Sequence, residues 1–531
     1  MKKQHGFRVL LSVLLLSIIY AVPHTAALAH PAVHHSKHYK AGVAFLQQGK
    51  ITQAIHELEH AVAQSAQAAY LRKLGEAYQA NSQYQKAADT YYREAQIHLK
   101  KGSIDTYLVV KAKGDALNSQ IKLFYERNGT FPVQYKLEKY EPGGGIYIGA
   151  FVEYDSNVGP NNVQEFNRIT GKKHAIYYTY HEYGKPFPVN WVAQVKEAGA
   201  AVQLSWEPNR GLDIVQDDNY LREFAIKANE AGVPIFLRFA SEMNGNWVAW
   251  NGNPAKYIQK FRLVSKVMKE EAPNVAMVWA PNSVPQKEIT KYYPGDQWVD
   301  WVGVNLYSVC FYNGDPSKSA VQVNPLDLLD FVYQEYADQK PIMLAEYGAT
   351  HFSAAGNLDA TRFAITKMNM LYQGVRVLYP RVKAIHWYSV NNFEKAHSAE
   401  RRLNNFSLTE NTKVLEAYKK MISNPYFLSQ VVNGPLMPSE SAAKIKNIPL
   451  EGKTLGANAT GLAWIKTYDP YISKVVYKID NQLLTTSYQY PFSFPLEINK
   501  LKQGKHQITV VVFDSKGRVA ARKDFSFIVK C

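Results

Sequence analysis

Hydrophobic positions follow three different patterns along the chain, and each pattern predicts its own kind of structure. Residues 36–128 place apolar side chains at helical spacing, whereas residues 143–428 alternate short β-rich runs with amphipathic helical stretches. Residues 448–530 contain alternating strands without helical periods. The sequence therefore predicts an all-α region, a mixed α/β domain and an all-β domain, in that order.

The helical region contains an internal repeat. Small and bulky residues recur 33 residues apart, in the order Gly42, Phe45, Leu58 and again Gly75, Tyr78, Tyr91. This spacing resembles the tetratricopeptide repeat, in which paired antiparallel helices stack side by side. We expect a further helix over residues 104–127 to cap the stack. Two roles are open for the repeats: a groove that binds a cell-surface protein partner, or a structural spacer.

The middle region predicts a closed barrel. Its eight β-rich runs are 146–153, 174–180, 201–206, 234–240, 275–280, 299–307, 341–346 and 382–387. Helical stretches follow several of them, which is the order of a TIM (β/α)8 barrel. An open doubly wound sheet would place a phosphate-binding glycine loop after its first strand, but the glycines at 143–145 precede that strand.

The C-terminal region predicts a small sandwich of the immunoglobulin-like type. Strands at 475–479, 506–513 and 525–529 are separated by turn residues such as Asp480 and Asn481. This domain either binds polysaccharide, with Trp464 as the stacking surface, or serves as a spacer.

The first residues have the pattern of an export signal. Lys2, Lys3 and Arg8 precede an apolar run at 9–21, and Ala27-Leu28-Ala29 forms a small-residue cleavage site. The apolar run is shorter than the roughly 18 residues that a membrane-spanning helix needs. We therefore expect residues 1–29 to be removed, leaving no integral membrane segment in a secreted or cell-surface protein.

Composition and charge narrow the function classes. The 531 residues are 46% hydrophobic and 20% charged, as in folded globular chains. The net charge of +16 suits anionic cell-wall surfaces, but no basic stripe or motif indicates a nucleic-acid partner. The two cysteines, Cys310 and Cys531, form at most one disulfide. No metal-ligand spacing is present, and we treat the histidines at 24–38 as an unfolded tail, so we expect no cofactor and no metal.

Two carboxylates stand at the ends of predicted barrel strands, where TIM barrels carry their catalytic groups. Glu242 follows the fourth strand in the segment LRFASEMNGNW, and Glu346 ends the seventh in IMLAEYG. Such a pair can act as acid and nucleophile on a glycosidic bond, provided that the carboxyl groups lie about 5 to 5.5 Å apart.

These segments resemble glycoside hydrolase family 26, the retaining β-mannanases and related β-glucanases. The resemblance covers residues 143–428 and rests on RFASEMNGNWVAWNG, MVWAPN, VDWVGVNLYS and LAEYG. It implies that Glu242 is the acid/base and Glu346 the nucleophile. It also implies sugar-binding positions at Trp247 and Trp387, and a hydrogen bond from Tyr307 to the nucleophile. We expect Trp206 to line the pocket, Asn244 to lie in the substrate site and Arg238 to orient one of the two glutamates.

One position departs from the family pattern, because Ser241 stands where many members have a histidine before the acid/base. A serine hydroxyl donates a hydrogen bond but carries no proton charge. His181, at the end of the second strand, either contacts sugar or is an ordinary rim histidine.

The resemblance implies a secreted retaining endo-glycosidase that cleaves a β-1,4-linked hexose polysaccharide, with β-mannan as the first substrate to consider. The same mechanism on mixed-linkage β-1,3-1,4-glucan or on a bacterial exopolysaccharide is the alternative. A noncatalytic polysaccharide-binding scaffold is the third reading, against which the presence of both carboxylates speaks.

Overall fold

The computed structural model describes residues 31–131, 133, 135–160, 162–395, 402–432 and 443–530. The predicted signal peptide and Cys531 lie outside these residues. The chain forms two compact units, Met1–Asn81 and Ser82–Cys531. No helix in the described ranges combines the length and the apolar character that a membrane crossing requires.

The first unit contains three of the predicted helices, α1 (Pro31–Gln47), α2 (Ile51–Gln64) and α3 (Ala68–Ala80). Gly42 allows α1 and α2 to pack closely, since a Cβ atom at this position would lie 2.6 Å from the Leu58 side chain. The prediction of an unfolded tail is wrong at His38, which lies in α1 and whose Nδ1 is 2.6 Å from Glu57 Oε2. The likeness to tetratricopeptide repeats stays a prediction.

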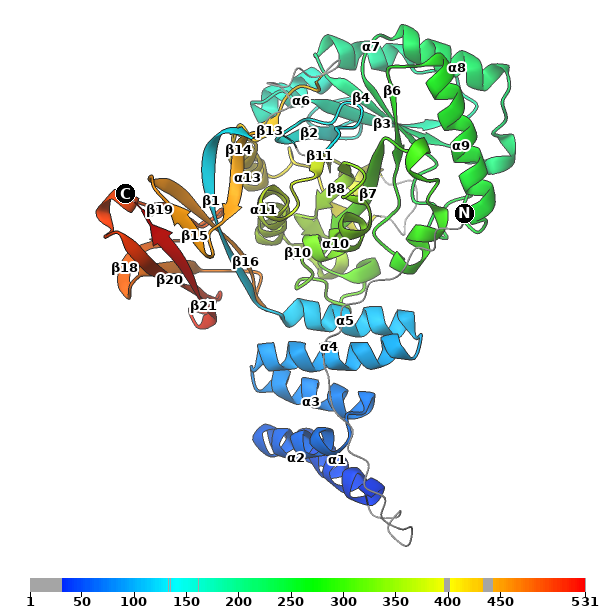
Figure 1. Ribbon diagram of the computed structural model, residues 1–531. Helices are drawn as coiled ribbons and strands as arrows, with labels where there is room; N and C mark the ends of the chain where they lie inside the picture. The colour runs from blue at the N-terminus through cyan, green and yellow to red at the C-terminus, as the bar shows by residue number, and fades with distance from the viewer. Residues whose placement is uncertain are drawn as a thin grey trace, which may run out of the picture. The chain divides into compact units, whose positions relative to one another are not determined.

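The second unit begins with α4 (Tyr84–Lys100) and α5 (Ile104–Leu117), and here the sequence prediction fails at one boundary. The expected helix over 104–127 ends at Leu117, and the chain continues as the strand β1 (Gln120–Phe131). β1 pairs with β14 (Ala443–Pro449) and β16 (Ala459–Lys466), more than 300 residues away in the sequence. Figure 1 shows β1 lying beside these C-terminal strands.

The predicted barrel is confirmed. Eight parallel strands form one sheet that closes through the pairing of β11 with β2. In chain order they are β2 (Ile146–Phe151), β3 (Ile176–Glu182), β4 (Ala201–Glu207), β5 (Ile235–Phe239), β6 (Val275–Trp279), β7 (Trp301–Ser308), β8 (Ile342–Ala349) and β11 (Val382–Tyr388). The short strand β13 (Phe427–Leu428) adds to β2.

Helices surround this barrel (Figure 1). They are α6 (Val163–Thr170), α7 (Val189–Glu197), α8 (Asn219–Glu230), α9 (Pro254–Glu271), α10 (Pro325–Tyr336), α11 (Thr361–Leu378) and α13 (Thr412–Ile422). Asp218, Asn253 and Asn324 begin α8, α9 and α10 with side chains that accept a hydrogen bond from the first-turn backbone. Because side chains alternate along a strand, one row packs on these helices and the other faces the barrel interior.

The C-terminal domain is a two-sheet sandwich, as predicted. One sheet has the order β14-β1-β16-β19, with β19 at Ser493–Leu496. The other has the order β15-β21-β20-β17-β18, and these strands span Lys453–Leu455, Val519–Val529, Gly504–Phe513, Lys474–Ile479 and Gln482–Ser487.

Trp464 does not offer a surface to polysaccharide, contrary to the expectation from sequence. It lies in β16, is only 8% exposed and joins Phe124 and Leu462 in the core cluster of the barrel. The first sheet therefore packs one face on the barrel, while Ile121 and Leu123 on its other face belong to the sandwich core.

Candidate active site

Glu346 lies in β8, 4% exposed, at the centre of a set of hydrogen-bond donors. Its Oε1 accepts hydrogen bonds from the Tyr180 hydroxyl at 2.7 Å and from Arg238 Nη2 at 2.5 Å, and its Oε2 accepts one from the Tyr307 hydroxyl. Burial, together with the charge of Glu346, raises the pKa of Tyr180 and of Tyr307 well above the ordinary value. Both phenols therefore remain donors, and the arrangement suits a carboxylate at Glu346.

Arg238 is fully buried on β5 and connects three strands. Besides Glu346 it donates to Ser205 Oγ on β4 at 3.2 Å and to Asn305 Oδ1 on β7 at 3.1 Å. Although burial disfavours the charged form, Glu346 and the neighbouring tyrosines raise the pKa of Arg238 above its ordinary value. Arg238 thus orients Glu346, which is one of the two roles the sequence left open.

Glu242 follows β5 and is partly exposed. Its Oε2 accepts a hydrogen bond from the Trp247 indole at 2.7 Å, and its Oε1 accepts bonds from the side-chain amides of Asn282 at 2.9 Å and Asn305 at 2.8 Å. Asn305 therefore contacts both Glu242 and Arg238. A continuous chain of hydrogen bonds runs from Glu242 through Asn305 and Arg238 to Glu346.

The backbone around Glu242 is unusual. Ala240 and Glu242 have φ values of 48° and 57°, in the left-handed region that non-glycine residues seldom adopt. Gly245 leaves room for the Trp247 ring, since a Cβ atom there would lie 2.3 Å from it. The turn that presents Glu242 is thus specified by its own sequence.

Asn244 and Trp247 differ in their access to solvent. Asn244 is 2% exposed and exchanges two hydrogen bonds of 2.9 Å with the Asn282 backbone. It holds the loop that carries Asn282 and does not face the solvent. The Trp247 ring is 44% exposed, which leaves a flat apolar surface beside Glu242.

Three residues expected in the pocket lie elsewhere. Trp206 and Trp387 are fully buried; the Trp206 ring stacks on Phe224 of α8 with centroids 3.9 Å apart, and Trp387 packs on Tyr418 of α13. His181 is paired in register with Trp206, and its ring lies 5.9 Å from Phe224. All three belong to the outward rows of their strands, so the placement of Trp206 and Trp387 in the pocket is wrong, and His181 agrees with the alternative of an ordinary rim histidine.

The inward rows carry residues that the sequence analysis missed. Tyr180 precedes His181, Tyr388 follows Trp387, and Glu207 follows Trp206. Tyr388 lies beside Tyr307, with ring centroids 5.7 Å apart. The alternation of side chains along a strand could have identified these residues. On β4, Gln203 donates to the Ala345 carbonyl inside the barrel and Ser205 contacts Arg238. Glu207, two residues further on, therefore also faces inward.

Glu207 is a third carboxylate at this end of the barrel. Burial is the main reason that its pKa rises to about 7, and the charges of Glu346 and Glu242 raise it further, against the lowering effect of Arg238. Its Oε1 accepts a hydrogen bond from Ser205 Oγ at 3.1 Å. The site therefore holds a carboxyl group that changes charge near neutral pH.

Among the residues that the structure describes, no group of three His, Cys, Asp or Glu side chains is placed to hold a metal ion. Paired carboxylates with different surroundings can carry out acid, base and nucleophilic steps without one.

Comparison with known proteins matches the same segments. The family model for glycosyl hydrolase family 26 matches residues 200–329, and the model for a bacterial Ig domain matches residues 449–510. The chain is 26% identical over 307 residues to endoglucanase H of Acetivibrio thermocellus, covering 53% of this chain and 31% of the relative. It is 28% identical over 161 residues to mannan endo-1,4-beta-mannosidase A and B of Caldalkalibacillus mannanilyticus, covering 28% of this chain and 27% of the relative.

These relatives are longer proteins, and the chain spans less than a third of their length. Among solved structures, an endo-beta-1,4-mannanase double mutant of Cellulomonas fimi superposes with a TM-score of 0.39 at 13% identity, over 73% of this chain and 94% of that one. The match of the family model includes Glu242 and its surroundings, and the eight-stranded barrel continues it to Glu346. The barrel of this chain is a glycosyl hydrolase family 26 domain, and it is joined to a bacterial Ig domain.

Proposed function

We propose that the chain is a secreted retaining endo-glycosidase that hydrolyses a β-1,4-linked hexose polysaccharide, and that its substrate is β-mannan. The observation that carries the proposal is the hydrogen-bonded chain from Glu242 to Glu346, which holds two carboxyl groups in different surroundings. Glu346 is buried and accepts a bond from the charged Arg238, whereas Glu242 accepts bonds from three uncharged groups and is partly exposed beside the open Trp247 ring.

The two carboxyl groups divide the work. Glu346 attacks the anomeric carbon of the substrate while Glu242 gives its proton to the departing oxygen, so that a glycosyl–enzyme ester forms. Glu242, now ionised, then takes a proton from water as the water attacks the same carbon, and Glu346 leaves as a carboxylate. The configuration at the anomeric carbon is retained after the two inversions.

Trp247 supports binding on the departing side of the cleaved bond. Its exposed ring is flat and apolar, and its indole is fixed by the bond to Glu242. A sugar ring stacked there would place its glycosidic oxygen next to the proposed acid.

The β-mannan assignment draws support from the mannosidase relatives, and the alternative of a β-glucan draws support from the endoglucanase, which aligns over more residues. The test is the release of reducing ends and short oligomers from β-mannan, glucomannan, mixed-linkage β-glucan and β-xylan. Release from mannan supports the proposal, release from the mixed-linkage glucan alone favours the alternative, and no release by folded protein from any of the four polymers contradicts both.

The two glutamates can be distinguished by the leaving group. Glu242→Ala should lose turnover of the polysaccharide but still release the aryl group from an aryl glycoside of the same sugar in a first burst, because a good leaving group needs no acid to form the ester, whereas breakdown of the ester then lacks its base. Glu346→Ala should lose both activities. Equal behaviour of the two variants would contradict the assigned roles.

A further inference from the structure

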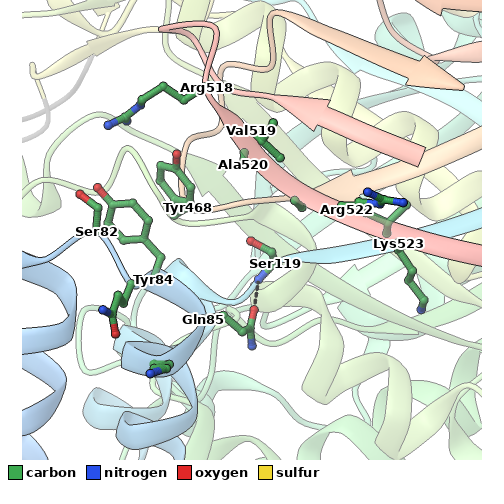
Figure 2. Close-up of a pocket in the computed structure, with 14 residues that line it drawn as sticks. Ser82, Tyr84, Gln85, Ser119, Tyr468, Arg518, Val519, Ala520, Arg522 and Lys523 are labelled. Carbon is green, nitrogen blue, oxygen red and sulfur yellow. Dashed lines mark hydrogen bonds between the residues drawn. The ribbon is translucent and has the colours of Figure 1, made fainter. Parts of the chain in front are cut away.

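A groove in the unit Ser82–Cys531 is lined by residues distant in the sequence from Glu242 and Glu346. It has a volume of about 580 Å³ and is formed by the start of α4, the start of β1, the loop at Tyr468 and the residues from Arg518 to Lys523. Figure 2 shows the stacked rings of Tyr84 and Tyr468 at one end and the side chains of Arg522 and Lys523 at the other. Nothing in the proposed hydrolysis uses this groove.

The groove is positively charged. Among the described residues that line it, four are basic and none is acidic; the basic ones are Lys86, Arg518, Arg522 and Lys523. Arg518 is held 2.9 Å from Asp514, which neutralises part of its charge. Arg522 and Lys523 are exposed, and Nε of Arg522 lies 4.0 Å from Oδ1 of Asp524.

The floor of the groove is flat and apolar. The rings of Tyr84 and Tyr468 lie 3.8 Å apart between centroids at an angle of 22°, and the Tyr468 hydroxyl is tied to Asp514 at 2.8 Å. Val519 is 58% exposed in the same groove. Flat apolar surfaces of this kind receive the C–H faces of sugar rings.

A polar atom in the groove also points to a ligand that carries hydroxyl groups. Oε1 of Gln83 is buried and has no hydrogen-bond partner among the described residues. A buried acceptor without a donor is costly, and a hydroxyl of a bound sugar would satisfy it.

The charge of the whole C-terminal domain favours an anionic partner. Residues 443–530 contain 14 Lys and Arg against 6 Asp and Glu, so this part of the chain carries half of the net charge of +16. Long-range attraction of an anionic polymer would therefore bring it to this domain before it reaches the groove.

We propose that this groove binds an acidic polysaccharide, in which sugar rings that each carry one carboxylate stack on the apolar floor while Arg522 and Lys523 pair with the carboxylates. Arg522 and Lys523 follow each other in β21, so their side chains leave opposite faces of the strand and can pair with carboxylates on two different rings, and arginine binds carboxylates in a two-pronged geometry. The domain would then hold the enzyme on an anionic matrix, independently of the polymer that the barrel cleaves.

The test uses the full chain and polygalacturonate as the probe, with binding measured by calorimetry at low salt. Arg522→Ala/Lys523→Ala should weaken binding about tenfold or more. Lys502→Ala/Lys505→Ala removes the same charge from exposed positions of the sandwich outside the groove, and should change the affinity less than about twofold. Tyr84→Leu keeps the charge and should also weaken binding, because the stacked floor is lost.

Three results would overturn the proposal. The first is no binding of polygalacturonate by the wild-type chain, and the second is an equal loss in the two double variants, which would show attraction by net charge alone. The third is equal competition by poly-glutamate, which would make the partner an acidic polypeptide. Turnover of the barrel substrate should be unchanged in all three variants, so failure here is separable from failure of the proposed hydrolysis.

Discussion

At the scale of single residues, the site depends on a few side chains that each serve two partners. Asn305 is the clearest example, because its amide N–H donates to Glu242 while its carbonyl oxygen accepts from Arg238. It is 1% exposed, so neither of its hydrogen bonds can be replaced readily by bulk water. We regard it as a positioning residue that couples the two carboxyl groups.

Replacing Asn305 by Ala should lower kcat about 10- to 100-fold and change KM much less, since one buried donor of Arg238 loses its acceptor and Glu242 loses one donor. Steady-state kinetics on the polysaccharide that releases reducing ends in the panel assay is the measurement. A variant with wild-type kcat would show that the network does not position the glutamates. Ser317→Ala, in an exposed loop, serves as the unaffected control.

Glu207 gives the site a specific response to pH. Because its pKa is about 7, it becomes ionised as the pH rises through neutrality and adds a negative charge next to the two proposed catalytic glutamates. The profile of kcat/KM against pH should therefore contain a step near pH 7 that is absent in Glu207→Gln. A step of the same size in this variant would contradict the role of Glu207.

The same residue affects stability with a defined sign. Burial raises the pKa of Glu207 from 4.5 to about 7, so the folded state holds this proton more tightly than the unfolded chain, and the resulting stabilisation is lost as the pH rises from 4.5 through 7. Glu207→Gln should therefore raise Tm relative to the wild type more at pH 8 than at pH 5. Thermal unfolding at the two pH values tests this, and a larger gain at pH 5 would be the contrary result.

At the scale of elements, the period of two along each strand decides which residues reach the site. The sequence motifs placed Glu242 and Glu346 at strand ends and located all eight barrel strands, but they selected Trp206, Trp387 and His181 where the neighbouring residues Glu207, Tyr388 and Tyr180 face inward. A shift of one residue moves a side chain to the other face of the sheet. Large aromatic residues at strand ends were therefore ambiguous, because they fill the helix layer as well as pockets.

The strand β1 was not predicted from the sequence, for a different reason. Its partners β14 and β16 lie at the other end of the chain, and a local hydrophobic pattern cannot show which distant segment a strand pairs with.

The packing of β1 can be tested by a single substitution. Leu123→Ala should lower the free energy of unfolding by about 2 to 4 kcal/mol, because Leu123 is 2% exposed in the sandwich core. Chemical denaturation measures the loss. Arg127→Ala, at an exposed position of β1, is the matched control, and equal stabilities of the two variants would contradict the packing of β1.

At the scale of the whole molecule, every residue of the candidate site belongs to the unit Ser82–Cys531. Removing residues 30–81 should therefore leave kcat/KM on a soluble polysaccharide within about twofold of the full chain. A larger loss would show that the first unit takes part in catalysis. Unchanged turnover together with lost retention at the cell surface would agree with a partner-binding role for the helical repeats.

The position of β1 also fixes an order of events during synthesis. β1 leaves the ribosome before the barrel, yet both of its partner strands are encoded after the barrel. Nascent chains fold from the N-terminus, so the apolar side chains of β1 must wait, unpaired, while the whole barrel is translated. A premature stop before residue 443 would leave a folded barrel with a bare strand edge, which is a template for aggregation. The yield of folded protein thus depends on the last strands of the chain, even though Glu242 and Glu346 precede them in the sequence.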